Sequence, residues 1–88
     1  MFIKLYTKRG CPFCTKAVSF LEENNIVFTE YILGENFLRE FIVDNYPTAK
    51  TYPVIVIDDT YIGGYTDLKE HFNSIGLNKL EYLIEGRE

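Results

Sequence analysis

The sequence has few of the residues that small proteins use for cross-links and metal sites, because its 88 residues include two cysteines and one histidine. Two cysteines are too few for the disulfide framework of a small secreted domain, and a structural zinc needs four ligands. No apolar run approaches the roughly 20 residues of a membrane-spanning helix. The first residues, Met1 to Tyr6, lack the apolar core and cleavage site of a signal peptide. We therefore expect a soluble, cytoplasmic protein with no metal and no membrane partner.

Charge and composition limit the class of partner and the number of domains. The net charge is −4, which argues against nucleic acid or an anionic membrane as the partner. Hydrophobic residues make up 47% of the chain and include seven Phe and seven Tyr, so one core can form despite the short length. We expect a single, monomeric domain over residues 1–88. Four basic residues nevertheless make the region around the cysteines locally positive: Lys4, Lys8, Arg9 and Lys16.

The spacing of apolar residues predicts seven structural elements before residue 77, and a short terminal helix after them. Apolar or alternating runs indicate strands, and apolar residues at i, i+3, i+4 and i+7 indicate the buried face of a helix. In the first helix, Pro12 suits the first position and Asn24 and Asn25 suit the end. The predicted elements are, in order, a strand over 2–6, a helix from 12 that ends at 24–25, a strand over 26–32, a helix over 36–45, strands over 53–57 and 60–62, and a helix from 66.

The order of these elements predicts an α/β fold of the type βαβ-αββα. The first three elements form a parallel strand–helix–strand unit. The turn at Asp58 and Asp59 joins the last two strands as an antiparallel hairpin, and the apolar run 53–57 suits a strand buried on both faces. The expected result is a four-stranded mixed sheet flanked by helices on both faces.

The second and third helices have predicted inner faces. In the third helix, Asp67 followed by Glu70 has the spacing of a capping box. Residues 77–88 form a short terminal helix in this interpretation. The predicted inner residues are Phe37, Leu38, Phe41 and Ile42 in the second helix, and Leu68, Phe72 and Ile75 in the third.

Both cysteines lie in the stretch Cys11-Pro12-Phe13-Cys14, at a predicted strand-to-helix junction. A thiol with a pKa of about 8.5 is only about 3% ionised at pH 7. The free N–H groups and the dipole at a helix N-terminus lower the pKa of a thiol placed there, and basic neighbours add to this effect. Cys14 lies one turn further along, on the apolar stripe, where burial keeps a thiol protonated. Cys11 is therefore the predicted nucleophile and Cys14 the resolving thiol.

Several motifs also have structural interpretations. The cysteine pair has the spacing of half a zinc site, although His71 is the only histidine that could complete it. Pro53 is either a strand-opening proline or the second residue of a cis peptide bond. Gly63 and Gly64 form either a simple turn or a place where the backbone approaches a ligand closely at a helix N-terminus.

Three ordered motifs resemble those of dithiol glutaredoxins: Tyr6 to Cys14, Thr51-Tyr52-Pro53, and Gly63 to Asp67. The resemblance covers about residues 1–75 and leaves 77–88 outside the recognisable motifs. It implies a thioredoxin-like fold, a cis Tyr52–Pro53 bond and a groove for glutathione beside Cys11.

The resemblance also implies which residues bind glutathione. Lys8 and Lys50 face the glycine carboxylate, Tyr52 pairs with glutathione through its backbone, and the end of the third helix takes the γ-glutamyl group. Tyr52 departs from the smaller valine that is common at its position, and Phe13 from the commoner tyrosine. The implied set is Lys8, Phe13, Lys50, Thr51, Tyr52, Pro53, Gly64, Thr66 and Asp67.

The leading functional hypothesis is a glutathione-dependent thiol–disulfide oxidoreductase, with glutathione as co-substrate. Its substrates are glutathione mixed disulfides and protein disulfides, with ribonucleotide reductase as one candidate partner. One alternative is a redoxin that donates electrons to ribonucleotide reductase and is reduced by a flavoprotein reductase. Another is a carrier of an iron–sulfur cluster between two chains, against which Pro12 and Cys14 both argue.

Overall fold

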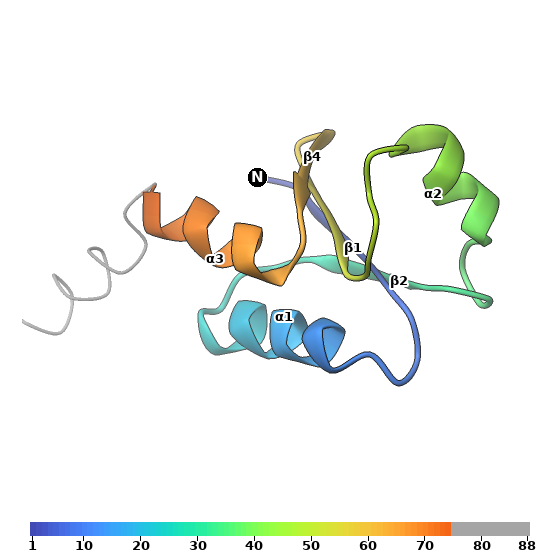
Figure 1. Ribbon diagram of the computed structural model, residues 1–88. Helices are drawn as coiled ribbons and strands as arrows, with labels where there is room; N and C mark the ends of the chain where they lie inside the picture. The colour runs from blue at the N-terminus through green and yellow to red at the C-terminus, as the bar shows by residue number, and fades with distance from the viewer. Residues whose placement is uncertain (75–88) are drawn as a thin grey trace, which may run out of the picture.

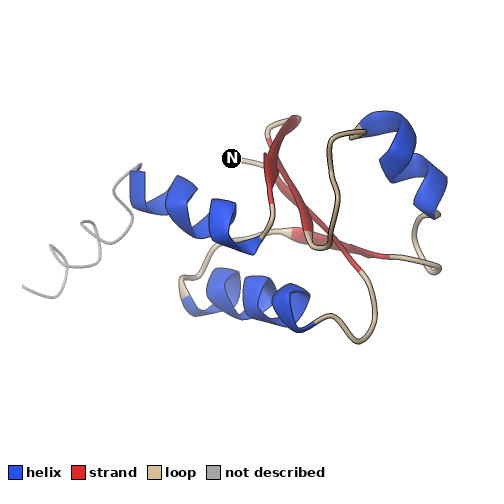
Figure 2. Ribbon diagram, in the orientation of Figure 1, coloured by secondary structure: helices blue, strands red, loops and turns tan. Residues whose placement is uncertain are grey.

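In the computed structural model, which describes residues 1–74, strands and helices alternate along the chain except for one pair of consecutive strands (Figure 1, Figure 2). No helix within these residues is long and apolar enough to cross a lipid bilayer. The elements are β1 (Ile3–Thr7), α1 (Pro12–Glu23), β2 (Thr29–Ile32), α2 (Arg39–Asn45), β3 (Val54–Ile57), β4 (Thr60–Gly63) and α3 (Tyr65–Ser74).

The strands form one mixed sheet in the order β2-β1-β3-β4, which confirms the predicted topology. β1 pairs with β2 in parallel and with β3 in antiparallel, and β3 pairs with β4 in antiparallel. Asp58 and Asp59 both have positive φ, 50° and 67°, as a two-residue hairpin turn between right-twisted strands requires. All four residues of β3 are buried, as expected for a strand covered on both faces.

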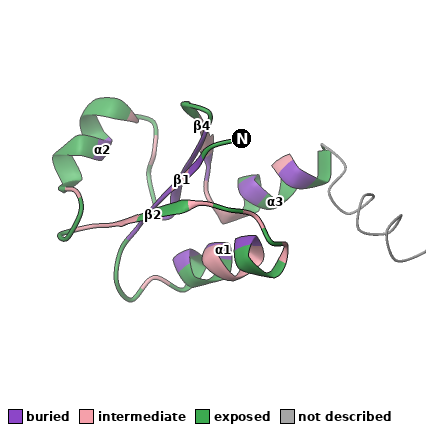
Figure 3. Cartoon of the chain, turned by 180° about the vertical axis from the view of Figure 1, so that it is seen from behind, coloured by how far each residue is buried: buried purple, intermediate pink, exposed green. Residues whose placement is uncertain are grey.

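Helices cover both faces of the sheet. α1 and α3 pack on one face, where Leu21, Leu68 and Phe72 meet Ile3 and Leu5 of β1. Because successive strand residues point to opposite faces, Tyr6 belongs to the other face. There it packs with the side chains of Ile42, Val54 and Val56. Figure 3 shows that α2, on this second face, is mostly exposed, whereas α1 and α3 bury one side each.

Two predicted elements are too long. The strand predicted over 26–32 is β2, which starts at Thr29. Asn25 has a left-handed φ of 57°, and the Ile26 N–H donates to the Leu21 carbonyl, so the chain is still turning out of α1 at that point. Val27 is 87% exposed. The apolar residues before Thr29 therefore belong to a connection that packs partly on the core without entering the sheet.

The helix predicted over 36–45 begins only at Arg39. A turn precedes it, in which Gly34 N–H donates to the Phe37 carbonyl and the Asn36 side chain accepts from Ile32 N–H. These bonds hold the backbone out of the helix. The prediction that Leu38 lies on the inner face is wrong, because its side chain is 66% exposed.

The predicted third helix is confirmed, but its start and its cap differ. α3 begins at Tyr65, so Asp67 lies in the first turn and is not the residue that precedes the helix. Leu68 and Phe72 are buried as predicted. The prediction for Ile75 and the terminal helix predicted over 77–88 lie outside the described residues.

Candidate active site

The junction of β1 and α1 presents the two cysteines. β1 ends at Thr7, Gly10 takes a positive φ of 71° in the loop, and Cys11 stands as the extended residue just before α1. Pro12 occupies the first helical position, as predicted. Cys11 is half-buried, whereas Cys14 is only 4% exposed and faces the core. The predicted asymmetry between an accessible and a shielded sulfur is therefore present in the fold.

The two cysteines form a disulfide, with their Cα atoms 5.2 Å apart, a separation within the normal range. The Cys14 N–H donates to Cys11 Sγ at 3.2 Å and also to the Cys11 carbonyl at 3.1 Å. Cys11 Sγ thus occupies the position of a helix-capping acceptor. A negative charge on that sulfur would be stabilised by this N–H and by the helix dipole. The geometry can therefore hold Cys11 as a thiolate after reduction.

The loop before β3 closes one side of the cysteine pair. The Tyr52–Pro53 peptide bond is cis, and Pro53 is buried. The Tyr52 carbonyl oxygen lies 3.7 Å from Cys11 Sγ, although the two residues are 41 positions apart. A disulfide sulfur carries no proton, so this is a van der Waals contact that becomes a weak S–H···O bond only in the thiol form. Burial raises the pKa of Tyr52 above its ordinary value, and the Arg39 charge opposes the shift.

A groove of about 380 Å³ runs from this loop to the start of α3. Every residue that the resemblance assigned to glutathione lines it, with the exception of Lys8. Phe13 forms one wall, where its ring centroid lies 6.2 Å from that of Tyr65. The structure also adds lining residues that the motifs did not indicate: Thr48, Tyr61 and Tyr65.

Lys8 lies beside the groove and not in it. Its Nζ atom is 5.6 Å from the centroid of the ring of Tyr52, which lines the groove. Lys50, by contrast, lines the groove and is exposed. Of the two lysines predicted to face one carboxylate, Lys50 therefore lines the groove, whereas Lys8 lies near the ring of a residue that lines it.

The start of α3 forms the other end of the groove. The Gly64 N–H donates to Asp67 Oδ2 at 3.1 Å, and the Leu68 N–H donates to the Gly64 carbonyl at 3.0 Å. Asp67 is the third residue of the helix, and its side chain therefore caps the backbone N–H of the residue before the helix, as the N3 side chain of a capping box does. Gly63 has a φ of 134°, and a Cβ atom there would overlap the Asp67 carboxyl group. The sequence indicated the glycine pair, but only the structure shows that Gly63 is the constrained member.

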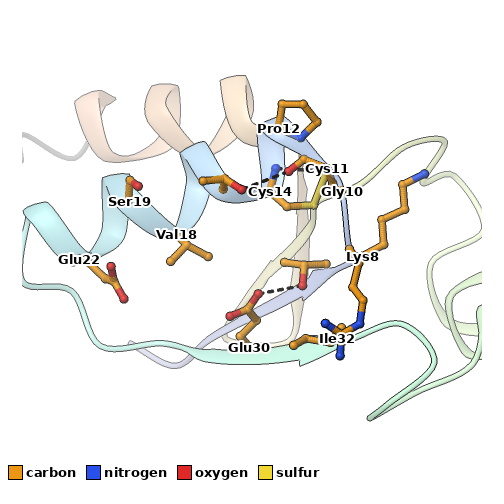
Figure 4. Close-up of a pocket in the computed structure, with 13 residues that line it drawn as sticks. Lys8, Gly10, Cys11, Pro12, Cys14, Val18, Ser19, Glu22, Glu30 and Ile32 are labelled. Atoms are coloured by element: carbon orange, nitrogen blue, oxygen red, sulfur yellow. Dashed lines mark hydrogen bonds between the residues drawn. A yellow bond between two sulfur atoms is a disulfide. The ribbon is translucent and has the colours of Figure 1, made fainter.

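A second hollow, of about 740 Å³, lies on the opposite side of the cysteines, between α1 and the edge strand β2 (Figure 4). Thr7, only 2% exposed, donates from Oγ1 to Glu30 Oε2 at 2.8 Å in its floor. Sequence reasoning missed this pair, because Thr7 and Glu30 meet only through the pairing of β1 with β2. Lys8, Cys11 and Cys14 line this hollow.

Metal ligands do not cluster at the site. Within residues 1–74, no group of three or more His, Cys, Asp or Glu side chains is placed to hold a metal ion. His71 lies on α3, where its ring packs edge-on against Phe72.

Comparison with known proteins agrees with this geometry. Residues 3–62 match the glutaredoxin family model. A probable glutaredoxin of Synechocystis sp. is 35% identical over 83 residues, which cover 93% of this chain and 91% of that protein. Glutaredoxin 1 of Rickettsia felis is 35% identical over 88 residues, covering 97% and 82% respectively. The crystal structure of glutaredoxin 1 from Francisella tularensis complexed with cacodylate superposes with a TM-score of 0.70 at 40% identity, over 84% of this chain and 94% of that one.

These matches extend over both the cysteine pair and the Tyr52–Pro53 loop, and they agree with the observed sheet order. The fold is thioredoxin-like. The chain therefore belongs to the glutaredoxin family and is a thiol–disulfide oxidoreductase that works through Cys11 and Cys14.

Proposed function

We propose that this protein is a glutathione-dependent oxidoreductase that reduces glutathione mixed disulfides and protein disulfides. We further propose that it acts as a monomeric single domain in the cytoplasm, with ribonucleotide reductase among its candidate targets. The observation that carries the proposal is the groove beside Cys11, which joins the cis-proline loop to the start of α3.

The chemistry of the groove suits a short acidic peptide such as glutathione. Its volume of about 380 Å³ falls in the range of small-ligand clefts, about 300–1,000 Å³. Lys50 supplies a cation at one end for the glycine carboxylate. At the other end, the first N–H groups of α3 have no acceptor within the helix and suit the α-carboxylate of the γ-glutamyl group. The Asp67 carboxylate beside them suits the α-ammonium group.

Both half-reactions with a glutathione mixed disulfide follow from the position of Cys11. With glutathione in the groove, the Cys11 thiolate attacks the glutathione sulfur of a mixed disulfide. A bond forms between these two sulfurs, the old disulfide bond breaks, and the substrate leaves as a thiolate that takes a proton from water. The thiolate of a second glutathione then attacks the glutathione sulfur bound to Cys11, which releases oxidised glutathione and restores the Cys11 thiolate.

Protein disulfides require the second cysteine. After Cys11 has formed a mixed disulfide with the substrate protein, the Cys14 sulfur attacks Cys11 Sγ and releases the second substrate thiol. The substrate gains two electrons, and the protein is left with the Cys11–Cys14 disulfide. Two glutathione molecules then reduce that disulfide. Cys14 is buried and one helical turn away, so it attacks only a sulfur held at the Cys11 position.

Two cysteine variants test the proposal in an assay coupled to glutathione reductase and NADPH. We expect Cys11→Ser to lose all turnover. Cys14→Ser should keep turnover of the mixed disulfide of glutathione with 2-mercaptoethanol and lose reduction of a protein disulfide. Activity surviving in the Cys11→Ser protein would contradict the assignment of the nucleophile.

The same preparation separates the alternatives. Turnover driven by a flavoprotein reductase, with none driven by glutathione, would favour the redoxin hypothesis. A brown protein purified without air, with the absorbance of an iron–sulfur cluster, would favour the cluster-carrier hypothesis.

A further inference from the structure

The hollow between α1 and β2 is not used by the proposed glutathione chemistry, although it opens on the same sulfur atoms (Figure 4). On α1 it is lined by one face of the helix, whose residues are spaced at i, i+3, i+4 and i+7: Thr15, Val18, Ser19 and Glu22. On β2 it is lined by Glu30 and Ile32, which share one face of the strand. The hollow therefore extends from the cysteines along the whole length of α1.

Its two ends differ in charge. Lys8 and Arg9 lie at the cysteine end, and Arg9 is ion-paired with Glu35. Glu22 lies at the far end, and Glu30 lies on the floor nearer the cysteines, beside Thr7 (Figure 4). Within residues 1–74 neither carboxylate has a cationic partner. Glu30 is held in place by the buried Thr7 hydroxyl. The hollow beyond its basic end is therefore negative, and Glu30 is the preorganised one of its two carboxylates.

The helix itself adds to this negative potential. The last turn of α1 contains no basic residue, so Glu22 and Glu23 both stand at the end of the helix where the dipole disfavours an anion. This arrangement is unfavourable for the isolated fold. A cation supplied from outside at the far end would interact favourably with Glu22 and with the carbonyl end of the helix, and a cation nearer the cysteines with Glu30.

We propose that this hollow docks the protein substrate, and that Glu22 and Glu30 select substrates with a basic residue near the reacting cysteine. The inference rests on the proposed reduction of protein disulfides. From Cys14 to Glu22 the helix advances by about 12 Å, at about 1.5 Å per residue. An extended chain covers that distance in about four residues, at about 3.3 Å each. The preferred substrate therefore carries Lys or Arg about four residues from the cysteine that Cys11 attacks.

Model peptides test this preference without glutathione. Two disulfide-looped peptides differ only in having Lys or Glu four residues outside each cysteine. The reduced protein is mixed with each peptide, and quenched samples are analysed for the Cys11–Cys14 disulfide. One protein disulfide forms for each peptide disulfide reduced. We expect the Lys peptide to react about three- to tenfold faster at low ionic strength, a ratio typical of one or two exposed charge pairs, and the ratio to fall in 0.5 M NaCl, where the Debye length is only about 4 Å.

Matched variants assign the preference to the hollow. Glu22→Lys should reduce the ratio to about one or reverse it, and the combined Glu22→Gln and Glu30→Gln protein should bring it close to one. Glu23→Lys makes the same charge change at the next residue, which does not line the hollow, and should leave the ratio within about twofold of the unmodified protein.

Two results would overturn the inference. One is equal rates for the two peptides with the unmodified protein. The other is an equal loss of preference in Glu23→Lys and Glu22→Lys, which would assign the effect to net charge. Both leave the glutathione-coupled assay unaffected, so this inference can fail while the proposed function stands. Failure to exchange with either peptide would overturn both.

Discussion

Replacing Gly63 by alanine probes the junction that positions the end of the groove. Gly63 closes β4 with a φ of 134°, a conformation that residues with a Cβ atom rarely adopt. The new methyl group would also overlap the carboxyl group of Asp67, which accepts the N–H of Gly64 and so caps α3. The Asp67 side chain can rotate away, but only by losing that hydrogen bond.

The expected destabilisation is the sum of these two effects. A residue forced into such a backbone region costs about 1–3 kcal/mol. Loss of a capping hydrogen bond costs about 0.5–2 kcal/mol. We expect Gly63→Ala to lower the free energy of unfolding by about 1.5–5 kcal/mol, and the melting temperature of a domain of this size by at least about 6 °C.

Gly64→Ala is the matched control. A Cβ atom on Gly64 would lie 3.7 Å from the Pro53 carbonyl oxygen, which is an ordinary contact, so its cost should stay below about 1 kcal/mol. Urea unfolding followed by far-ultraviolet circular dichroism gives both values, provided the slope m is unchanged. In the Asp67→Ala background, the overlap with the carboxyl group is absent and only the contact with the residue-67 Cβ at 2.9 Å remains, so Gly63→Ala should cost about 1 kcal/mol less than in the unmodified protein. Equal costs for the two glycine variants, or no coupling to Asp67, would refute the reasoning.

Two further predictions concern the aromatic face and the groove. Burial and the neighbouring Tyr46 raise the pKa of Tyr6 from 10.0 to about 12, so the fold favours the neutral phenol. The corresponding contribution to the free energy of unfolding, up to about 2–3 kcal/mol, is fully present below pH 10 and is lost as the pH rises towards 12. In urea titrations across that pH range, Tyr6→Phe should flatten the decline in stability. An equally steep decline in the variant would exclude Tyr6 as its source. Lys50→Glu should raise the KM for a glutathione mixed disulfide by about three- to tenfold, because a carboxylate then faces the glycine carboxylate. Lys4→Glu, the same charge change outside the groove, should leave that KM unchanged, and similar values for both variants would show that Lys50 does not contact the substrate.

The functional residues could be read largely from local patterns. Pro12 at the first helical position and Cys14 on the apolar stripe fix which cysteine is shielded, because a helix buries residues at a spacing set by its own geometry. The errors occurred where local hydrogen bonds compete with the pattern. Apolar residues before Thr29 and Arg39 suggested longer elements, but side-chain and turn hydrogen bonds around Asn36 and a left-handed Asn25 hold the backbone in connections.

The strand and helix order, the place of the dithiol at a strand-to-helix junction and its asymmetry all follow from the amino-acid sequence, because each depends on neighbours within one or two turns. Three contacts appear only in the folded chain: the Tyr52 carbonyl lies against Cys11, Asp67 reaches back to Gly64, and Thr7 holds Glu30 beneath the cysteines. The first and third of these contacts join residues 41 and 23 positions apart, and both depend on how strands pair across the sheet. The Asp67 contact depends instead on where α3 begins after β4, which the capping pattern placed at the wrong residue.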